Sequence, residues 1–121
     1  MKMYIAGPIT GIPDKNITAF TAATNLLLEN GHIPICPLTL NELDPVEDNW
    51  LSQMKRDLKY LVDCDAVFLL PGWETSKGAR LEVQVAKSLD IKVYRATDIR
   101  LLEEYITIDC EITPLIPSYF W

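Results

Sequence analysis

Two acidic residues in this sequence occupy positions where a helical pattern favours apolar side chains. Glu82 shares a predicted helix face with Val85, Ala86 and Leu89. It lies about one turn from the helix N-terminus, where the backbone dipole favours a negative charge. Asp57 falls in a row with Trp50, Met54 and Leu61, at helical spacings of four, three and four. A pair of carboxyl groups, one a nucleophile and one protonating a leaving group, is the apparatus that cleaves a glycosidic bond with retention.

Each acid also has an ordinary interpretation. Acidic residues are common in the first turn of a helix, and Glu82 would then only stabilise the start of its helix. Asp57 would be a solvated side chain that pairs with Lys59 or Arg56. The burial of the two side chains separates these interpretations.

The elements that must position these acids alternate between strand and helix. Short apolar runs predict four strands, at residues 2–6, 32–36, 66–70 and 91–94. Helical spacing and capping residues predict helices from Asn16 or Thr18 to about residue 30, from about 50 to 62 after Asp48 or Asn49, and from about Gly78. Such alternation, with nearly continuous apolar strands, indicates a parallel sheet covered on both faces. Pro34 places the second strand at an edge, because proline cannot donate to the ladder.

The segments between these elements include the expected ligand site. In an open parallel sheet, ligands bind beyond the carboxyl ends of the strands, so the loops at residues 7–11 and 72–78 are expected to converge with Glu82. Residues 37–47 are predicted to form an acidic loop that is long enough to shape a site. A last helix is expected at 97–105, and the aromatic tail, 106–121, is expected to pack on the body or on a neighbouring subunit.

Composition indicates one compact domain spanning residues 1–121. The chain is 49% hydrophobic and 23% charged, as expected for an ordinary core. Its net charge of −6, without a basic patch, argues against a nucleic-acid polymer or an anionic membrane as partner. No stretch approaches a membrane span or a secretion signal, and the three cysteines lack CxxC spacing, so a cytoplasmic protein with free thiols is expected.

Several familiar chemistries lack their motifs here. GxGxxG and GxxxxGK are absent, which argues against dinucleotide and P-loop phosphate sites, and no zinc-ligand spacing is present. The single histidine, His32, has no GxSxG partner motif for a serine hydrolase. We therefore expect no cofactor and no metal, and carboxylate chemistry remains.

Four segments resemble the nucleoside 2-deoxyribosyltransferase superfamily, and in particular its small branch common in phages and prophages. They are YIAGP at 4–8, MKRDL at 54–58, DCDAVFLLPGW at 63–73 and SKGARLE at 76–82. The resemblance covers about residues 1–95. It implies a flavodoxin-like (Rossmann-like) three-layer α/β sandwich with a four- to five-stranded parallel sheet in the order 2-1-3-4(-5). It also implies a homo-oligomer, a dimer or larger.

The resemblance assigns roles to three catalytic candidates. Glu82 matches the nucleophile that attacks the anomeric carbon of a deoxyribosyl group, and Asp57 matches the acid that assists protonation of the departing base. Tyr4 matches a tyrosine that hydrogen-bonds the nucleophile; its ordinary role would be that of a strand-end aromatic.

The resemblance also implies a set of substrate-binding residues. These are Gly7, Pro8, Thr10, Gly11, Trp50, Trp73, Ser76, Gly78 and Arg80. The glycine loop would approach the nucleoside, the two tryptophans would stack on a base, and Arg80 would contact a 5′-phosphate. The alternatives are turn glycines, core tryptophans and a surface arginine.

The expected function is cleavage of the N-glycosidic bond of a deoxynucleoside or its 5′-monophosphate, through a covalent deoxyribosyl-Glu82 intermediate. The sugar would pass to another base or to water, and the sequence leaves transferase and hydrolase open. An alternative is a non-catalytic nucleotide-binding module of the same fold. A third hypothesis is a structural protein whose interface is the aromatic tail.

Overall fold

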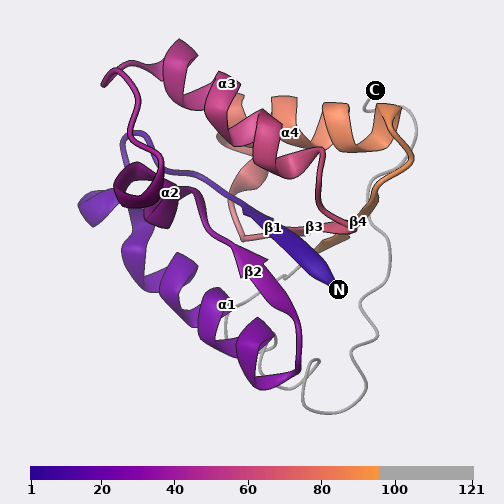
Figure 1. Cartoon of the computed structure of the whole chain (residues 1–121). Helices are drawn as coiled ribbons and strands as arrows, with labels where there is room; N and C mark the ends of the chain where they lie inside the picture. The colour runs from indigo at the N-terminus through magenta and orange to yellow at the C-terminus, as the bar shows by residue number, and fades with distance from the viewer. Residues whose placement is uncertain (96–121) are drawn as a thin grey trace.

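The computed structural model of this protein describes residues 1–95, which form a four-stranded parallel sheet with helices on both faces (Figure 1). The strands are β1 (Lys2–Ala6), β2 (Ile33–Ile35), β3 (Ala66–Leu69) and β4 (Lys92–Arg95), in the order β2-β1-β3-β4. β1 pairs in parallel with β2 on one side and with β3 on the other, and β3 pairs in parallel with β4. This confirms the predicted α/β fold and strand order; a fifth strand would lie outside the described residues.

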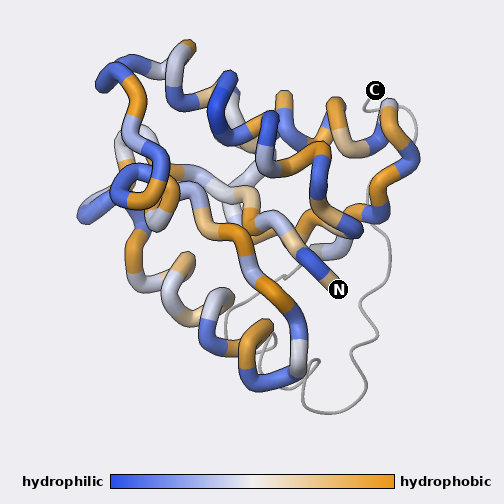
Figure 2. Tube along the Cα trace, viewed as in Figure 1, coloured by the Kyte–Doolittle hydropathy of each residue, from blue (hydrophilic) through white to orange (hydrophobic). Residues whose placement is uncertain are grey.

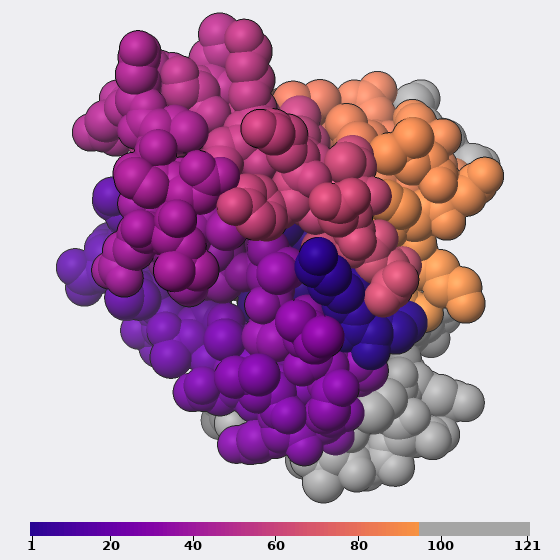
Figure 3. Space-filling model, viewed as in Figure 1, coloured from indigo at the N-terminus to yellow at the C-terminus, as the bar shows by residue number. Residues whose placement is uncertain are grey.

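Four α-helices accompany the sheet: α1 (Ile17–Glu29), α2 (Pro37–Leu43), α3 (Trp50–Leu61) and α4 (Lys77–Ser88). Two short 3-10 segments, Pro13–Asn16 and Trp73–Thr75, precede α1 and α4. α1 covers one face of the sheet, while α3 and α4 cover the other (Figure 1). In the space-filling view the α3 and α4 segments lie side by side (Figure 3).

The alternating side chains of β1 divide the core into two clusters. Met3 and Ile5 pack with Phe20 of α1, whereas Tyr4 and Ala6 pack on the side of α3 and α4. Since both faces of the strand are buried, every residue from position 3 to position 6 is sequestered from water. Hydrophobic and hydrophilic residues alternate around the helices, as expected for helices with one buried side (Figure 2).

The prediction of a loop at residues 37–47 is wrong in its first half. Pro37 begins α2 at a position where the missing N–H costs nothing, and the helix continues to Leu43. A helix of seven residues is too short to show helical periodicity in a sequence. The edge position of β2 is confirmed, although that strand is shorter than predicted.

The helices nearest the predicted site begin at side-chain caps. The Asn49 side chain accepts a hydrogen bond from the Ser52 N–H at the start of α3, and the Ser76 hydroxyl accepts one from the Ala79 N–H at the start of α4. Asn16 occupies the cap position of α1 without capping it. Its side chain donates instead to the carbonyl oxygen of Pro8 (3.1 Å), which ties the loop after β1 to the start of α1.

The predicted helix at 97–105, the tail at 106–121 and Cys110 lie outside the described residues. Cys36 and Cys64 are buried free thiols. Within residues 1–95, no helix has the length and apolar character needed to cross a membrane.

Candidate active site

A cavity of about 380 Å³ opens beyond the carboxyl end of β1, between the first turns of α3 and α4. This is the sheet edge at which the sequence predicted a ligand site. The structure brings most of the predicted site residues to its walls: Tyr4, Gly7, Pro8, Thr10, Trp50, Asp57, Ser76, Gly78 and Glu82.

Glu82 is a buried acid on the inner face of α4. Its side chain is only 4% exposed and lies among Ala79, Val83 and Ala86, which are also buried. Burial raises the pKa of the Glu82 carboxyl to about 8; the nearby charge of Asp57 adds to this rise, and the Tyr4 hydroxyl opposes it. Glu82 is therefore not a solvated first-turn residue, and it is largely protonated at neutral pH.

Asp57 is buried on the inner face of α3 and held by its neighbour Arg56. The guanidinium donates to Oδ1 of Asp57 through Nε (3.0 Å) and through Nη2 (2.9 Å). Burial raises the pKa of Asp57, while the hydrogen bonds and positive charge of Arg56 act in the opposite direction, as does the Tyr4 hydroxyl. The expected partnership with Arg56 is present, but the pair is buried rather than solvated.

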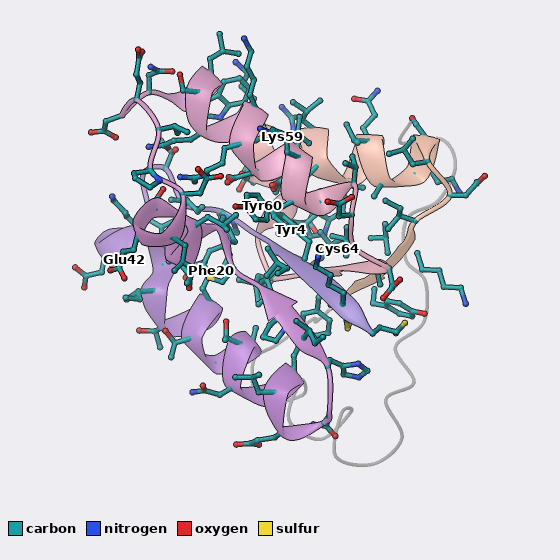
Figure 4. All side chains as sticks on the ribbon, viewed as in Figure 1. Tyr4, Phe20, Glu42, Lys59, Tyr60 and Cys64 are labelled. Carbon is teal, nitrogen blue, oxygen red and sulfur yellow. The ribbon has the colours of Figure 1, made fainter. Side chains whose placement is uncertain are left out.

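Tyr4 places a polar atom between the sheet and α3 (Figure 4). Its side chain is fully buried, and within the described residues its hydroxyl has no hydrogen-bond partner of good geometry. Burial, followed by the charges of Glu82 and Asp57, raises the pKa of this hydroxyl well above its usual value. The hydroxyl lies near both carboxyl groups, and a buried hydroxyl without a well-formed hydrogen bond costs about 1–3 kcal/mol.

Two glycines permit close packing around the cavity. A Cβ on Gly7 would lie 2.8 Å from Cβ of Leu70, so this position at the end of β1 has no room for a side chain. A Cβ on Gly78 would lie 2.8 Å from Cε of Met54 and 3.6 Å from Nε1 of Trp50. Gly78 therefore lets α4 approach α3 closely, which brings their two acids to one cavity.

A cation and an aromatic ring form part of the cavity wall. The Lys77 ammonium lies over the ring of Trp50, 4.1 Å from its centroid. Each is the first residue of its helix, Lys77 of α4 and Trp50 of α3. The pair leaves an aromatic surface and a positive charge available to a ligand.

Three of the expected binding residues do not line this cavity. Trp73 is buried in the core cluster under α4, where its Nε1 has no partner among the described residues. Arg80 is exposed. Gly11 lines an adjoining cavity of about 260 Å³, which shares Asp57 with the larger one.

Sequence reasoning placed Lys77 at the site edge only as part of the loop at 72–78, and it did not identify Gln53 as a residue of the cavity wall. Gln53 lies one helical turn before Asp57, and that spacing was a usable signal. Nothing within the loop singled out Lys77, because a lysine in the first turn of a helix is indistinguishable from a surface charge. Asn41, which lines the adjoining cavity, lies on the helix that the sequence did not predict.

The site offers carboxyl, hydroxyl and amide groups rather than a metal-ligand set. Within residues 1–95, no group of three or more His, Cys, Asp or Glu side chains is arranged to hold a metal ion. Two buried carboxyl groups beside one hydroxyl can supply a nucleophile and a proton donor.

Comparisons with known proteins relate this chain to a protein family and to a solved structure. A family described as "Domain of unknown function (DUF4406)" matches residues 1–95. A 2-deoxyribosyltransferase from the psychrotolerant bacterium Bacillus psychrosaccharolyticus has a similar structure, with a TM-score of 0.69 and 19% sequence identity over 96% of this chain and 100% of that chain. No curated protein matches the sequence significantly. The structural likeness establishes the shared α/β fold.

Proposed function

We propose that this chain, a member of the DUF4406 family of domains of unknown function, cleaves the N-glycosidic bond of a deoxynucleoside or a deoxynucleoside 5′-monophosphate. The proposed route passes through a deoxyribosyl group bound covalently to Glu82. The observation that carries the proposal is the convergence of Glu82, Asp57 and the Tyr4 hydroxyl on one cavity. The fold shared with a 2-deoxyribosyltransferase supports the choice of substrate class.

In the first step, a Glu82 carboxylate oxygen attacks the anomeric carbon of the sugar. The carbon–nitrogen bond breaks and its electron pair leaves with the base, while the Asp57 carboxyl gives its proton to that base. The products are a glycosyl ester of Glu82, an ionised Asp57 and the free base. The Tyr4 hydroxyl is placed to donate a hydrogen bond to the carboxyl groups as their charges change.

In the second step, the nitrogen of another base or a water molecule attacks the same carbon. The ester bond breaks and its electrons return to the Glu82 carboxylate, while Asp57 accepts the proton of the attacking group. Transfer to a base restores a nucleoside, and transfer to water releases the free sugar. The enzyme returns to its starting protonation state in both cases.

The protonation of the two carboxyl groups bears on these roles. Burial leaves a proton on Glu82 at neutral pH, and Arg56 favours the ionised form of Asp57. The proposed attack needs the opposite distribution, with Glu82 ionised and Asp57 protonated. The two carboxyl groups therefore act as a coupled pair that holds one proton, and the reactive form is the one in which that proton lies on Asp57.

A panel of deoxynucleosides and their 5′-monophosphates, incubated with and without an acceptor base, tests the proposal. Release of base by the wild-type protein and its loss in Glu82→Ala are expected. Release that requires an acceptor identifies a transferase, and release in water alone identifies a hydrolase. If no member of the panel reacts with the wild-type protein, the proposal is wrong.

The same panel of compounds distinguishes a non-catalytic nucleotide-binding module from an enzyme. Such a module binds members of the panel without releasing base, and its binding survives Glu82→Ala. Isothermal titration of the same compounds provides that measurement.

A further inference from the structure

Arg56 is the centre of a buried hydrogen-bond network beside the cavity. Its side chain is buried, and the guanidinium makes four hydrogen bonds. Two go to Oδ1 of Asp57, one goes to Oδ1 of Asn41 (2.9 Å), and one goes to the carbonyl oxygen of Asp44 (3.3 Å). A guanidinium has five N–H donors in a fixed fork, so this group is nearly saturated.

The two bonds from Arg56 to Asp57 converge on one oxygen. Both Nε and Nη2 donate to Oδ1, and Arg56 makes no bond to Oδ2. The two oxygens of the carboxyl group are therefore unequal. A proton on Oδ1 would face two N–H groups, whereas Oδ2 is free of Arg56 and belongs to a side chain that lines the cavity.

The second half of the network ties α2 and the segment after it to α3. Asn41 of α2 and the Asp44 carbonyl fix the far side of the Arg56 guanidinium, and the Tyr60 hydroxyl donates to Oδ2 of Asp44 (3.0 Å). Arg56 and Tyr60 lie one turn apart on α3 and hold the same segment. This gives the short helix α2 a role in holding the orientation of Arg56.

We propose that Arg56 is a positioning residue for Asp57. Asn41 holds the Arg56 guanidinium in place, and the guanidinium donates two hydrogen bonds to Oδ1 of Asp57. The other oxygen, Oδ2, is then the one that exchanges a proton with the departing group of the ligand. This inference rests on the proposed function. Arg56 acts through Asp57 and touches no reacting atom itself.

Other charged and titratable groups near Asp57 set the background for its titration. Tyr4 faces it from β1, and Glu82 faces it from α4. Lys77 lines the same cavity, while Lys15 and Asp48 line the adjoining one. None of these groups is a hydrogen-bond partner of the Arg56 guanidinium, so a change in the Asp57 titration is expected to report the loss of that guanidinium.

The test compares Arg56→Met, Arg56→Lys and Asn41→Ala with the wild-type protein by two measurements. Carbon-13 NMR of the Asp57 carboxyl follows its titration, and base release is followed across pH. Arg56→Met is expected to raise the Asp57 midpoint by about one to three pH units and to slow base release by about 100-fold. Lys55→Met, which removes an exposed cation one residue earlier on α3, is expected to change neither measurement.

Arg56→Lys separates position from charge. Lysine keeps a positive charge but lacks the planar fork, so it is expected to restore much of the Asp57 midpoint and little of the base-release rate. Asn41→Ala keeps Arg56 and is expected to slow base release by a smaller factor. Full recovery of the rate by lysine would overturn the positioning role, and so would an unchanged Asp57 midpoint in folded Arg56→Met.

A measurement on the wild-type protein covers the case in which Arg56→Met does not fold. The Nε–H resonance of Arg56 is expected to shift at the titration midpoint of Asp57, because this N–H donates a hydrogen bond to the Asp57 carboxylate. A resonance that stays constant through the Asp57 titration overturns the inference. If the wild-type protein releases no base, the proposed function fails, while the two NMR measurements still decide whether Arg56 holds Asp57.

Discussion

Glu82 combines full burial with the absence of a cation partner among the described residues, in contrast with Asp57 and its Arg56. Such a carboxyl group is costly to ionise in the folded chain, and it is retained where it serves chemistry rather than stability. At the residue scale, the buried Glu82 carboxyl is therefore expected to make the free energy of unfolding decrease as the pH rises.

Glu82→Gln is expected to stabilise the protein at and above neutral pH. The folded-state pKa of Glu82 is about 8, against 4.5 in the unfolded chain, so the unfolded state binds fewer protons between these values and wild-type stability falls as pH rises. The difference grows by about 1.4 kcal/mol per pH unit, to roughly 3–5 kcal/mol at pH 8, and vanishes near pH 4. Urea unfolding at several pH values measures it.

Glu29→Gln provides the matched control for that experiment, because Glu29 is an exposed acid at the end of α1. Its stability difference from the wild-type protein is expected to stay flat with pH. A difference for Glu82→Gln that is equally flat would contradict the burial of an uncompensated carboxyl group.

The rate of base release is expected to fall above about pH 8 in the wild-type protein. The pair of Glu82 and Asp57 then loses its last proton, and none remains for the departing base. In Asp57→Asn only Glu82 titrates, so the much slower residual rate should instead rise with pH as the nucleophile ionises. Profiles of kcat/KM against pH for both proteins test this, and a wild-type rate that climbs steadily through pH 9 would be inconsistent with it.

At the scale of elements, the close approach of neighbouring segments places the acids at one cavity. β1 and the segment after β3 meet at Gly7, where an added Cβ would contact the rigid Cβ of Leu70. α3 and α4 meet at Gly78, where an added Cβ would contact the flexible end of Met54. The shortest contact of an added Cβ is the same at both positions, but at Gly7 the base of the Leu70 side chain would have to move, and at Gly78 only the end of the Met54 side chain.

Gly7→Ala is expected to destabilise the protein by about 1–3 kcal/mol, because a backbone or the base of a side chain must shift. Gly78→Ala is expected to cost less than 1 kcal/mol, since the Met54 methyl can rotate away and alanine favours a helix. Thermal unfolding of the two variants measures the contrast. Equal losses at both positions would show that the approach of α3 to α4 is as rigid as that of β1.

The long elements and the two acids could be predicted because their patterns are strong. The apolar strands and the periodic helices α3 and α4 appear near their predicted positions, and Asp57 and Glu82 stand out as acids on apolar faces. α2 could not be predicted, because seven residues show no period. Polar residues at helix starts, such as Lys77, carry no signal that separates a cavity wall from a solvated surface.

Two expected binding residues show the limit of motif-based assignment. Arg80 precedes Glu82 by two helical positions, a rotation of about 200° that places the two side chains on opposite faces of α4. Trp73 lies in the loop that approaches the cavity, but its ring is buried in the hydrophobic core. Spacing within a motif therefore predicted the burial of the two acids at the cavity more reliably than the positions of the residues around them.

At the scale of the whole molecule, the sheet separates two cores and leaves its carboxyl edge open to a ligand. A ligand that binds only the folded chain stabilises it by about 2.7 kcal/mol at a hundred times its Kd. We expect a deoxynucleoside or its monophosphate to raise the Tm by about 10 °C under those conditions.

Trp50→Ala is expected to reduce that shift, because Trp50 lines the cavity. Leu51→Ala, which removes an exposed apolar side chain from the next position of α3, is expected to leave it intact. Differential scanning fluorimetry across the substrate panel measures both. A shift that survives Trp50→Ala unchanged would place the ligand elsewhere on the molecule.

Intact-protein mass spectrometry after rapid acid quenching, followed by peptide mapping, tests for the covalent deoxyribosyl-Glu82 intermediate. A mass increase of one deoxyribosyl group on Glu82 is expected when the wild-type protein meets a reactive deoxynucleoside or monophosphate, and no adduct is expected on Glu82→Gln. An adduct on Asp57 would reverse the roles of the two acids. Base release without any adduct on the chain would contradict the covalent route.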